Sequence, residues 1–295
     1  MKDSECLLIK SSFLDVLINN NGAEIASIKN KKGIEYVWDA NPSIWGSSAP
    51  VLFPIIGGLK NGLYSFEGKE YKVNKHGFIR NNKKLVVKNH IDNSITFQYK
   101  YSEETLKNYP FEFEFNIRFS VEESTINVHH EIINHGDHTM FFSLGGHPAF
   151  RCPLYKDENY EDYQIKFEKK ETSETHLLNN NGLLSGQTKL LLNNTDILPL
   201  KHSLFKDDAL ILKNLKSKKV NLMHKTKGSI LSFEFNDFDY LGIWAKPEGD
   251  FVCIEPWLGV TDNENTDGNF KTKEGIKKLQ PKTLFKAYYS IVIMN

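Results

Sequence analysis

The stretch FEFEFNIRFS at residues 111–120 decides the fold class. Phe111, Phe113, Phe115, Ile117 and Phe119 alternate in it with charged or polar residues. A two-residue period places the apolar side chains on one face of a β-strand and the polar ones on the other. One buried face and one hydrated face are typical of an antiparallel sheet.

The same alternation recurs along the whole chain. It is present in SITFQYKY (94–101), DYQIKFEKK (162–170), SILSFEFND (229–237) and FKAYYSIVIMN (285–295), and turn signals such as NNNGAE (19–24) and INHGDH (133–138) separate the strands. Glycine and asparagine adopt the positive φ angles of tight turns cheaply. Only SEETLKNY (102–109) predicts a helix, with Ser102 as its N-cap.

The domain organisation follows from what the sequence lacks. A chain of 295 residues could hold two domains. We see no linker, low-complexity tract or repeat, and strands continue across the midpoint. The sequence therefore predicts an all-β fold, a large single-domain antiparallel β-sandwich that spans residues 1–295.

The amino-acid composition limits the classes of partner that the protein can bind. Lys+Arg and Asp+Glu are both 37, and this net charge of zero argues against nucleic-acid binding and membrane-surface binding and favours a small-molecule ligand. No apolar run is long enough to span a bilayer, and the N-terminus does not resemble an export signal. Cys6, Cys152 and Cys253 are too scattered for a disulfide framework or a CxxC metal site. We expect a cytoplasmic protein, monomeric or homodimeric, with no metal and no cofactor.

Two histidines stand in unusual settings. His76 belongs to KHGFIR (75–80), where an extended chain would place His76, Phe78 and Arg80 on one face, toward one ligand. A solvated surface strand is the alternative interpretation. His147 belongs to SLGGHPAFRCP (143–153), where the glycine pair before it permits close approach of backbone or ligand. Its alternative is a core histidine bonded to a backbone carbonyl.

Arginine is scarce, with only three residues in the chain. Arg80 and Arg151 each follow a candidate histidine by four positions. Because the guanidinium group is a planar, bidentate donor, both arginines suit an oxygen-rich ligand.

Candidate carboxylates come from two further segments. Glu255 lies in FVCIEPWLG (251–259), where we expect a partly buried strand end that raises the pKa of the carboxyl toward the range of a general base. Trp257 can stack on a sugar face or fill the core. Asp208 precedes the strand in SLFKDDALIL (203–212) and can accept hydrogen bonds from ligand hydroxyls.

Competing motifs are weaker. The histidines at 129, 130, 135 and 138, with Glu131, suggest a metal cluster by count, but neighbouring strand residues point to opposite faces, so we expect a solvated hairpin. Signatures of serine hydrolases, P-loop proteins and Rossmann folds are absent from the sequence.

Together these motifs resemble the aldose 1-epimerase (galactose mutarotase-like) superfamily, and within it the LacX-type branch. The resemblance is carried in order by APVLFPIIGGLKN (49–61), HGFIR (76–80), GGHPAFRCPL (145–154), EDYQIKF (161–167), SLFKDDALIL (203–212), LGIWA (241–245) and IEPWLG (254–259). It implies a galactose mutarotase-like supersandwich with a sugar-binding cleft on a concave sheet.

The resemblance also implies roles for individual residues. Glu255 is the base that removes the anomeric proton, His147 is the acid that protonates the ring oxygen, and His76 assists there. Arg80 and Asp208 match positions that contact sugar hydroxyls. Lys60 stands where the family usually has an arginine, which replaces a forked donor by a point charge.

Three alternatives stay open from the sequence. One is a hexose-6-phosphate 1-epimerase, because Lys60, Arg80 and Arg151 could serve a phosphorylated sugar as well as a free one. Another is a non-catalytic carbohydrate-binding or sensing protein that keeps the cleft. The third is a glycoside hydrolase or lyase with Glu255 and Asp208 as its two carboxylates.

Overall fold

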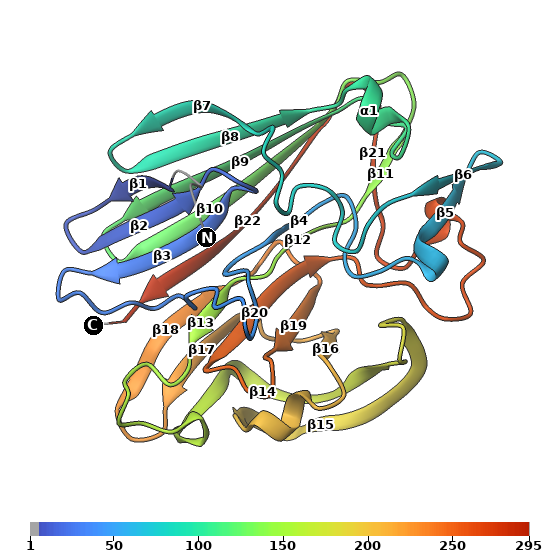
Figure 1. Ribbon diagram of the computed structural model, residues 1–295. Coiled ribbons are helices and arrows are strands. Elements are labelled where there is room, and N and C mark those ends of the chain that lie inside the picture. Colours follow the sequence, from blue (N-terminus) through green and yellow to red (C-terminus); the bar gives the residue numbers. More distant parts are fainter. Residues whose placement is uncertain (1–5, 295) are drawn as a thin grey trace.

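A computed structural model describes residues 6–294 and confirms the predicted all-β class (Figure 1). Its main sheet is antiparallel and has fifteen strands. Neighbouring strands along the sheet are β4 (Val51–Leu52), β12 (Leu144–Gly146), β20 (Phe251–Leu258), β19 (Tyr240–Trp244), β16 (Leu210–Lys213), β14 (Tyr163–Leu178), β17 (Lys219–His224), β18 (Gly228–Glu234), β22 (Leu284–Ile293), β10 (Thr125–Asn134), β9 (Phe113–Glu122), β8 (Ser94–Lys100) and β7 (Val86–Ile91). Off this path, β13 (Ala149–Arg151) pairs with β20, and β15 (Leu184–Pro199) pairs with β14.

Smaller sheets accompany the main one. They are formed by β1 (Cys6–Lys10), β2 (Leu14–Asn19) and β3 (Glu24–Asn30), by β5 (Leu63–Phe66) and β6 (Lys69–Lys72), and by β11 (Met140–Phe142) and β21 (Lys277–Leu279). The sheet β1–β2–β3 lies against β8 and β9 (Figure 1).

Helical structure is confined to short segments in the described chain. They are the helix α1 (Glu103–Leu106) and the 3-10 turns η1 (Lys60–Gly62), η2 (Tyr160–Asp162), η3 (His202–Phe205) and η4 (Phe270–Thr272). α1 confirms the helix predicted after Ser102, since the Ser102 hydroxyl accepts a hydrogen bond from the Thr105 amide at 3.3 Å. None of the helices in residues 6–294 is long and apolar enough to cross a membrane.

The FEFEF stretch forms β9 as predicted, although the strand begins at Phe113 rather than Phe111. Phe113, Phe115 and Ile117 are fully buried, and the ring of Phe53 packs 5.1 Å from that of Phe115. Arg118, on the opposite face, is exposed. The alternation therefore builds the core of this half of the sheet.

The prediction of a solvated histidine hairpin is wrong at one position. His130 on β10 is only 1% exposed, and its ring lies 6.3 Å from Phe115 and 5.9 Å from Tyr289. His129, its neighbour, points outward and stacks on Tyr288. The alternation of strand side chains that separates these histidines also turns one of them into the core.

Candidate active site

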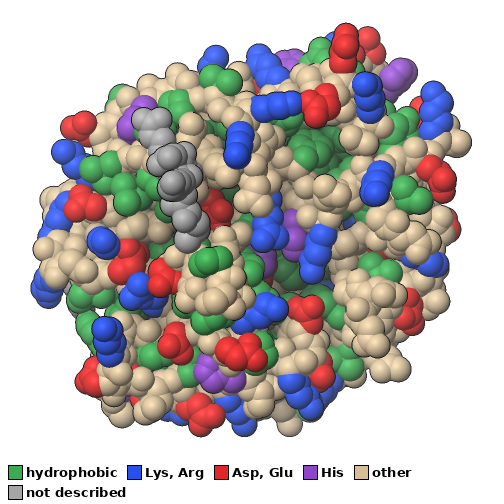
Figure 2. All heavy atoms as spheres, in the orientation of Figure 1, with side chains coloured by type: hydrophobic (Ala, Val, Ile, Leu, Met, Phe, Trp, Pro, Cys, Tyr) green, Lys and Arg blue, Asp and Glu red, His purple; other side chains and the backbone are tan. Residues whose placement is uncertain are grey.

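A cavity of about 520 Å³ opens beside β16, β19 and β20, and its size lies in the range of small-molecule sites. It is lined by six predicted site residues from four of the segments quoted above: His76, Arg80, His147, Asp208, Glu255 and Trp257. Figure 2 shows histidine side chains flanked by lysine or arginine side chains in a hollow near the middle of one face. Residues spread over most of the chain therefore meet at one place.

Glu255 lies in the middle of β20 and is 1% exposed, not partly buried at a strand end as the sequence suggested. All eight residues of β20 are buried, because both faces of this strand are covered. Opposite Glu255, Gly242 on β19 leaves room for the indole of Trp257: a Cβ there would lie 2.4 Å from Trp257 Cζ2. Burial, and then the charge of Asp208, raise the pKa of Glu255 well above its ordinary value.

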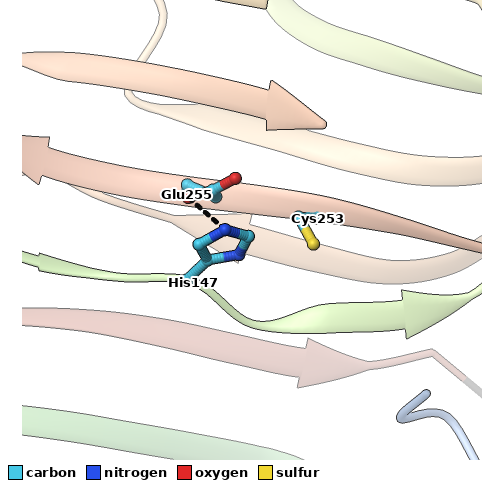
Figure 3. A group of neighbouring side chains, drawn as sticks. All are labelled: His147, Cys253 and Glu255. Atoms are coloured by element: carbon cyan, nitrogen blue, oxygen red, sulfur yellow. Dashed lines mark ion pairs between the residues drawn. The ribbon is translucent and has the colours of Figure 1, made fainter. Parts of the chain in front are cut away.

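His147 follows β12, which packs tightly on β20. A Cβ at Gly145 would lie 2.8 Å from the Trp257 ring and 2.9 Å from the Pro256 carbonyl oxygen, so the predicted need for glycine here is confirmed. The close approach brings His147 Nε2 to 3.4 Å from Glu255 Oε2 (Figure 3). Burial, and then the neighbouring His76, hold the pKa of His147 well below its ordinary value.

His76 lies in a turn, so the extended KHGFIR segment that would place His76, Phe78 and Arg80 on one face does not form. The φ angles of His76 and Gly77 are 68° and 82°, in the left-handed region. The turn arises because the Phe53 backbone passes so close to Gly77 that a Cβ would meet its carbonyl oxygen at 2.0 Å. His76 and Arg80 nevertheless both line the cavity.

The turn also fixes the tautomer of His76. The Gly57 amide donates a hydrogen bond to His76 Nδ1 at 3.2 Å, so the ring proton of the neutral imidazole lies on Nε2. Burial lowers the pKa of His76 to about 3. His76 is therefore a neutral hydrogen-bond donor whose ring centre lies 5.9 Å from that of His147.

Several polar atoms around the cavity have no hydrogen-bond partner within the described chain. They are Arg80 Nε, His147 Nδ1, Glu255 Oε2 and Trp257 Nε1. Buried polar groups are nearly always paired in native proteins. Four such groups at one cavity are typical of a site that a polar ligand completes.

Two predicted ligand residues lie elsewhere. Lys60 Nζ donates to the Thr266 carbonyl oxygen at 3.2 Å, and Arg151 Nε donates to the Val37 carbonyl oxygen at 3.2 Å. Neither residue lines the cavity. Asp208 does line it, from an exposed turn with a φ of 77°.

The sequence interpretation missed two tryptophans and three lysines that line the cavity. Trp45 stacks on His147 with ring centres 4.9 Å apart, and Trp244 meets the same imidazole edge-on at 5.5 Å. The chain has only four tryptophans, and three of them line this cavity, so their scarcity was a usable signal. The lysines are Lys75, Lys206 and Lys246.

A buried ion pair supports the loop beside the cavity. Lys273 Nζ lies 2.6 Å from Asp262 Oδ1, and both side chains are at most 5% exposed. Asp262 Oδ2 also accepts a hydrogen bond from the Lys60 amide at 2.9 Å. Thr261, the residue before Asp262, lines the cavity.

We expect Lys273→Met to lower the free energy of unfolding by about 3–5 kcal/mol, because it leaves a buried carboxylate unpaired. Lys31→Met is the matched control, since Lys31 and Asp15 are also 2.6 Å apart but 44% and 43% exposed. Such a surface pair contributes about 0–1 kcal/mol. Urea unfolding measures both, and equal losses in the two variants would contradict this account.

Comparisons with known proteins all point to the same family. A family model described as aldose 1-epimerase matches residues 5–274. The protein LacX, encoded on a plasmid of Lactococcus lactis subsp. lactis, is 33% identical over 97% of this chain and 99% of its own length. A galactose mutarotase related enzyme from Lactobacillus acidophilus is 37% identical, with a TM-score of 0.93 over 99% of this chain and 98% of that one. A galactose mutarotase-like protein from Lactobacillus casei is 28% identical, with a TM-score of 0.92 over 98% of this chain and 100% of that one.

Proposed function

Since the chain belongs to the aldose 1-epimerase family, we propose that it interconverts the α and β anomers of a hexose or related sugar. The observation that carries this proposal is the buried pair of His147 and Glu255, 3.4 Å apart at the cavity. Ring opening of an aldose needs one group that accepts a proton and one that donates a proton.

Burial prepares this pair for proton transfer. It favours the neutral form of both groups, so the resting pair holds one transferable proton, on Glu255. Transfer of that proton to His147 creates a carboxylate and an imidazolium without changing the net charge of the buried site. The pair therefore reaches its reactive form at a smaller free-energy cost than if only one of the two residues became charged.

The reaction then balances without any other reactant. Glu255 accepts the proton of the anomeric hydroxyl while His147 donates its proton to the ring oxygen. The bond between C1 and the ring oxygen breaks as the C1 carbonyl forms. Rotation about the C1–C2 bond and the reverse transfers close the ring on the other face, which yields the other anomer and restores both residues.

The neighbouring side chains suit this chemistry. His76 presents an Nε2 proton that can hydrogen-bond a sugar oxygen, since Nδ1 is occupied by the Gly57 amide. Trp45 and Trp244 hold the His147 ring from two sides. Arg80 and Trp257 offer unpartnered N–H donors for sugar hydroxyls.

Polarimetry of freshly dissolved α-glucose and α-galactose tests the proposal. We expect the first-order rate of mutarotation to rise in proportion to protein concentration for at least one sugar. Binding of a sugar in calorimetry without such acceleration would instead indicate a non-catalytic carbohydrate-binding protein.

One observation favours a phosphorylated sugar as a second candidate substrate. Four cationic side chains line the cavity, those of Lys75, Arg80, Lys206 and Lys246, although the chain as a whole has no net charge. Among residues 6–294, the acidic residues that line the cavity are Asp208 and the buried Glu255. Such a cluster attracts an anionic group.

If the substrate is a hexose 6-phosphate, replacing Lys75, Lys206 and Lys246 together by Gln will raise its KM by about threefold or more. The estimate takes about 0.2–1 kcal/mol for each exposed charge pair that is lost. The KM of the free hexose serves as the internal reference, and Lys60→Gln, outside the cavity, is the control variant. An equal change of KM for both sugars would contradict phosphate binding by these lysines.

A further inference from the structure

A buried thiol lies beside the proposed acid–base pair. Cys253 is two positions before Glu255 on β20, so both side chains project from the same face of the strand. Figure 3 shows Cys253, Glu255 and His147 gathered from two neighbouring segments. One ligand atom from each of the three lies within 4.8 Å of the other two. The proposed reaction gives this thiol no role.

Imidazole nitrogen, thiolate sulfur and carboxylate oxygen are the donors that Zn²⁺ takes in proteins, and three of them with a fourth position open is a common arrangement. Glu255 Oε2, one of the candidate ligand atoms, is buried and has no hydrogen-bond partner in the described chain. The protein thus leaves this carboxylate oxygen free to bind a cation.

The spacing fits a zinc ion after a small adjustment. Zn–N and Zn–O bonds of about 2.1 Å place tetrahedral ligand atoms about 3.4 Å apart. His147 Nε2 and Glu255 Oε2 are 3.4 Å apart already. The Cys253 sulfur needs separations of about 3.6 Å from the other two ligand atoms, because its Zn–S bond is about 2.3 Å long. All three ligand atoms lie within 4.8 Å of one another, so the sulfur has to approach by at most about 1 Å.

The route from solvent to the site and the charge balance of the bound state also favour metal binding. His147 and Glu255 line the cavity, so an ion can reach the site from solvent, and a water molecule can take the fourth position from the cavity side. Binding displaces one proton from the thiol and one from the acid–base pair to solvent. A divalent ion with one thiolate and one carboxylate leaves the buried site neutral.

We propose that His147, Cys253 and Glu255 form a binding site for a thiophilic divalent cation such as Zn²⁺, and that the bound ion inhibits the enzyme. Inhibition follows because the metal occupies the lone pairs that the proton transfers use. The inhibitory consequence rests on the proposed function, whereas the binding site does not.

Cobalt(II) titration of the full chain tests the site directly. A Cys6→Ser background removes the one exposed cysteine. In it we expect one Co²⁺ per chain and a near-ultraviolet charge-transfer band from cobalt–thiolate bonding. Cys253→Ser will abolish the band and weaken Co²⁺ binding by at least about tenfold. Cys152→Ser, which removes the other buried cysteine, will keep both. A Co²⁺ complex of the Cys6→Ser protein without the band, or a band that persists when Cys253→Ser is added, would overturn the site.

Two further measurements keep the test decisive. If Cys253→Ser fails to fold, as judged by circular dichroism, Cys253→Ala and His147→Gln replace it, and each will lose affinity for Co²⁺ by at least about tenfold. Stoichiometric Zn²⁺ will lower the rate of mutarotation, and EDTA will restore it. Cobalt bound through Cys253 with a rate unaffected by Zn²⁺ would keep the site and refute the inhibition. If the protein has no epimerase activity, the cobalt spectrum still tests the binding site.

Discussion

Glu255→Gln is expected to lower kcat for mutarotation by about 10²–10⁴-fold, the usual contribution of a general base. Glutamine keeps the volume and the buried position of Glu255 but cannot accept the anomeric proton. Because the amide can still hydrogen-bond a sugar hydroxyl, KM will change much less than kcat. Polarimetry at several sugar concentrations separates the two constants.

Glu171→Gln is the matched control for this variant. Glu171 is also a buried carboxyl, 2% exposed, but the Ser217 amide and hydroxyl each donate to it at 2.7 Å, and it lies outside the cavity. Any loss that arises merely from replacing a buried carboxyl group by an amide will therefore be visible in both variants. A kcat for Glu255→Gln within about threefold of that of Glu171→Gln would show that Glu255 is not the base.

The second large effect is expected for His147→Gln, which removes the group that protonates the ring oxygen. We expect kcat to fall by about 10²–10⁴-fold, as for Glu255→Gln. Since the two residues exchange one proton and act as a unit, the double variant will be little slower than either single variant. Losses that multiply in the double variant would show that the residues act independently.

His224→Gln controls for the removal of a buried histidine. His224 is 6% exposed and lies on β17, away from the cavity. We expect its kcat to stay close to that of the wild type even if its thermal stability falls. If His224→Gln lost as much activity as His147→Gln, the loss would reflect packing and not acid catalysis.

The strands were predictable because their alternation is local. In β9 the two-residue alternation places the apolar side chains on one face of the strand, and that face is buried. Phe113, Phe115 and Ile117 could therefore be assigned to the core without any long-range information. The turn at His76 was not predictable in this way. It depends on the Phe53 backbone, more than twenty positions away in the sequence, which leaves no room for a side chain at Gly77.

The candidate site likewise contains residues that could be predicted from the sequence and residues that could not. His147 and Glu255 were found because each is embedded in an unusual local motif. Trp45 and Trp244 were missed because they come from separate segments and meet only around the His147 ring. Proximity in sequence was misleading for Arg151, since β13 pairs with β20 and directs that guanidinium toward the Val37 carbonyl oxygen. Burial of Glu255 exceeded expectation because β20 is covered on both faces.

The central claim is that this chain exchanges anomers by moving protons between the sugar and the pair of His147 and Glu255. Two-dimensional exchange NMR of an equilibrated aldose tests it most directly, because it records conversion between the α and β anomeric protons without net reaction. The account predicts exchange cross-peaks that grow with wild-type protein, with no new signals, and that return to the buffer level with Glu255→Gln. Cross-peaks at the buffer level for every free and phosphorylated hexose, or signals of a new product, would contradict it.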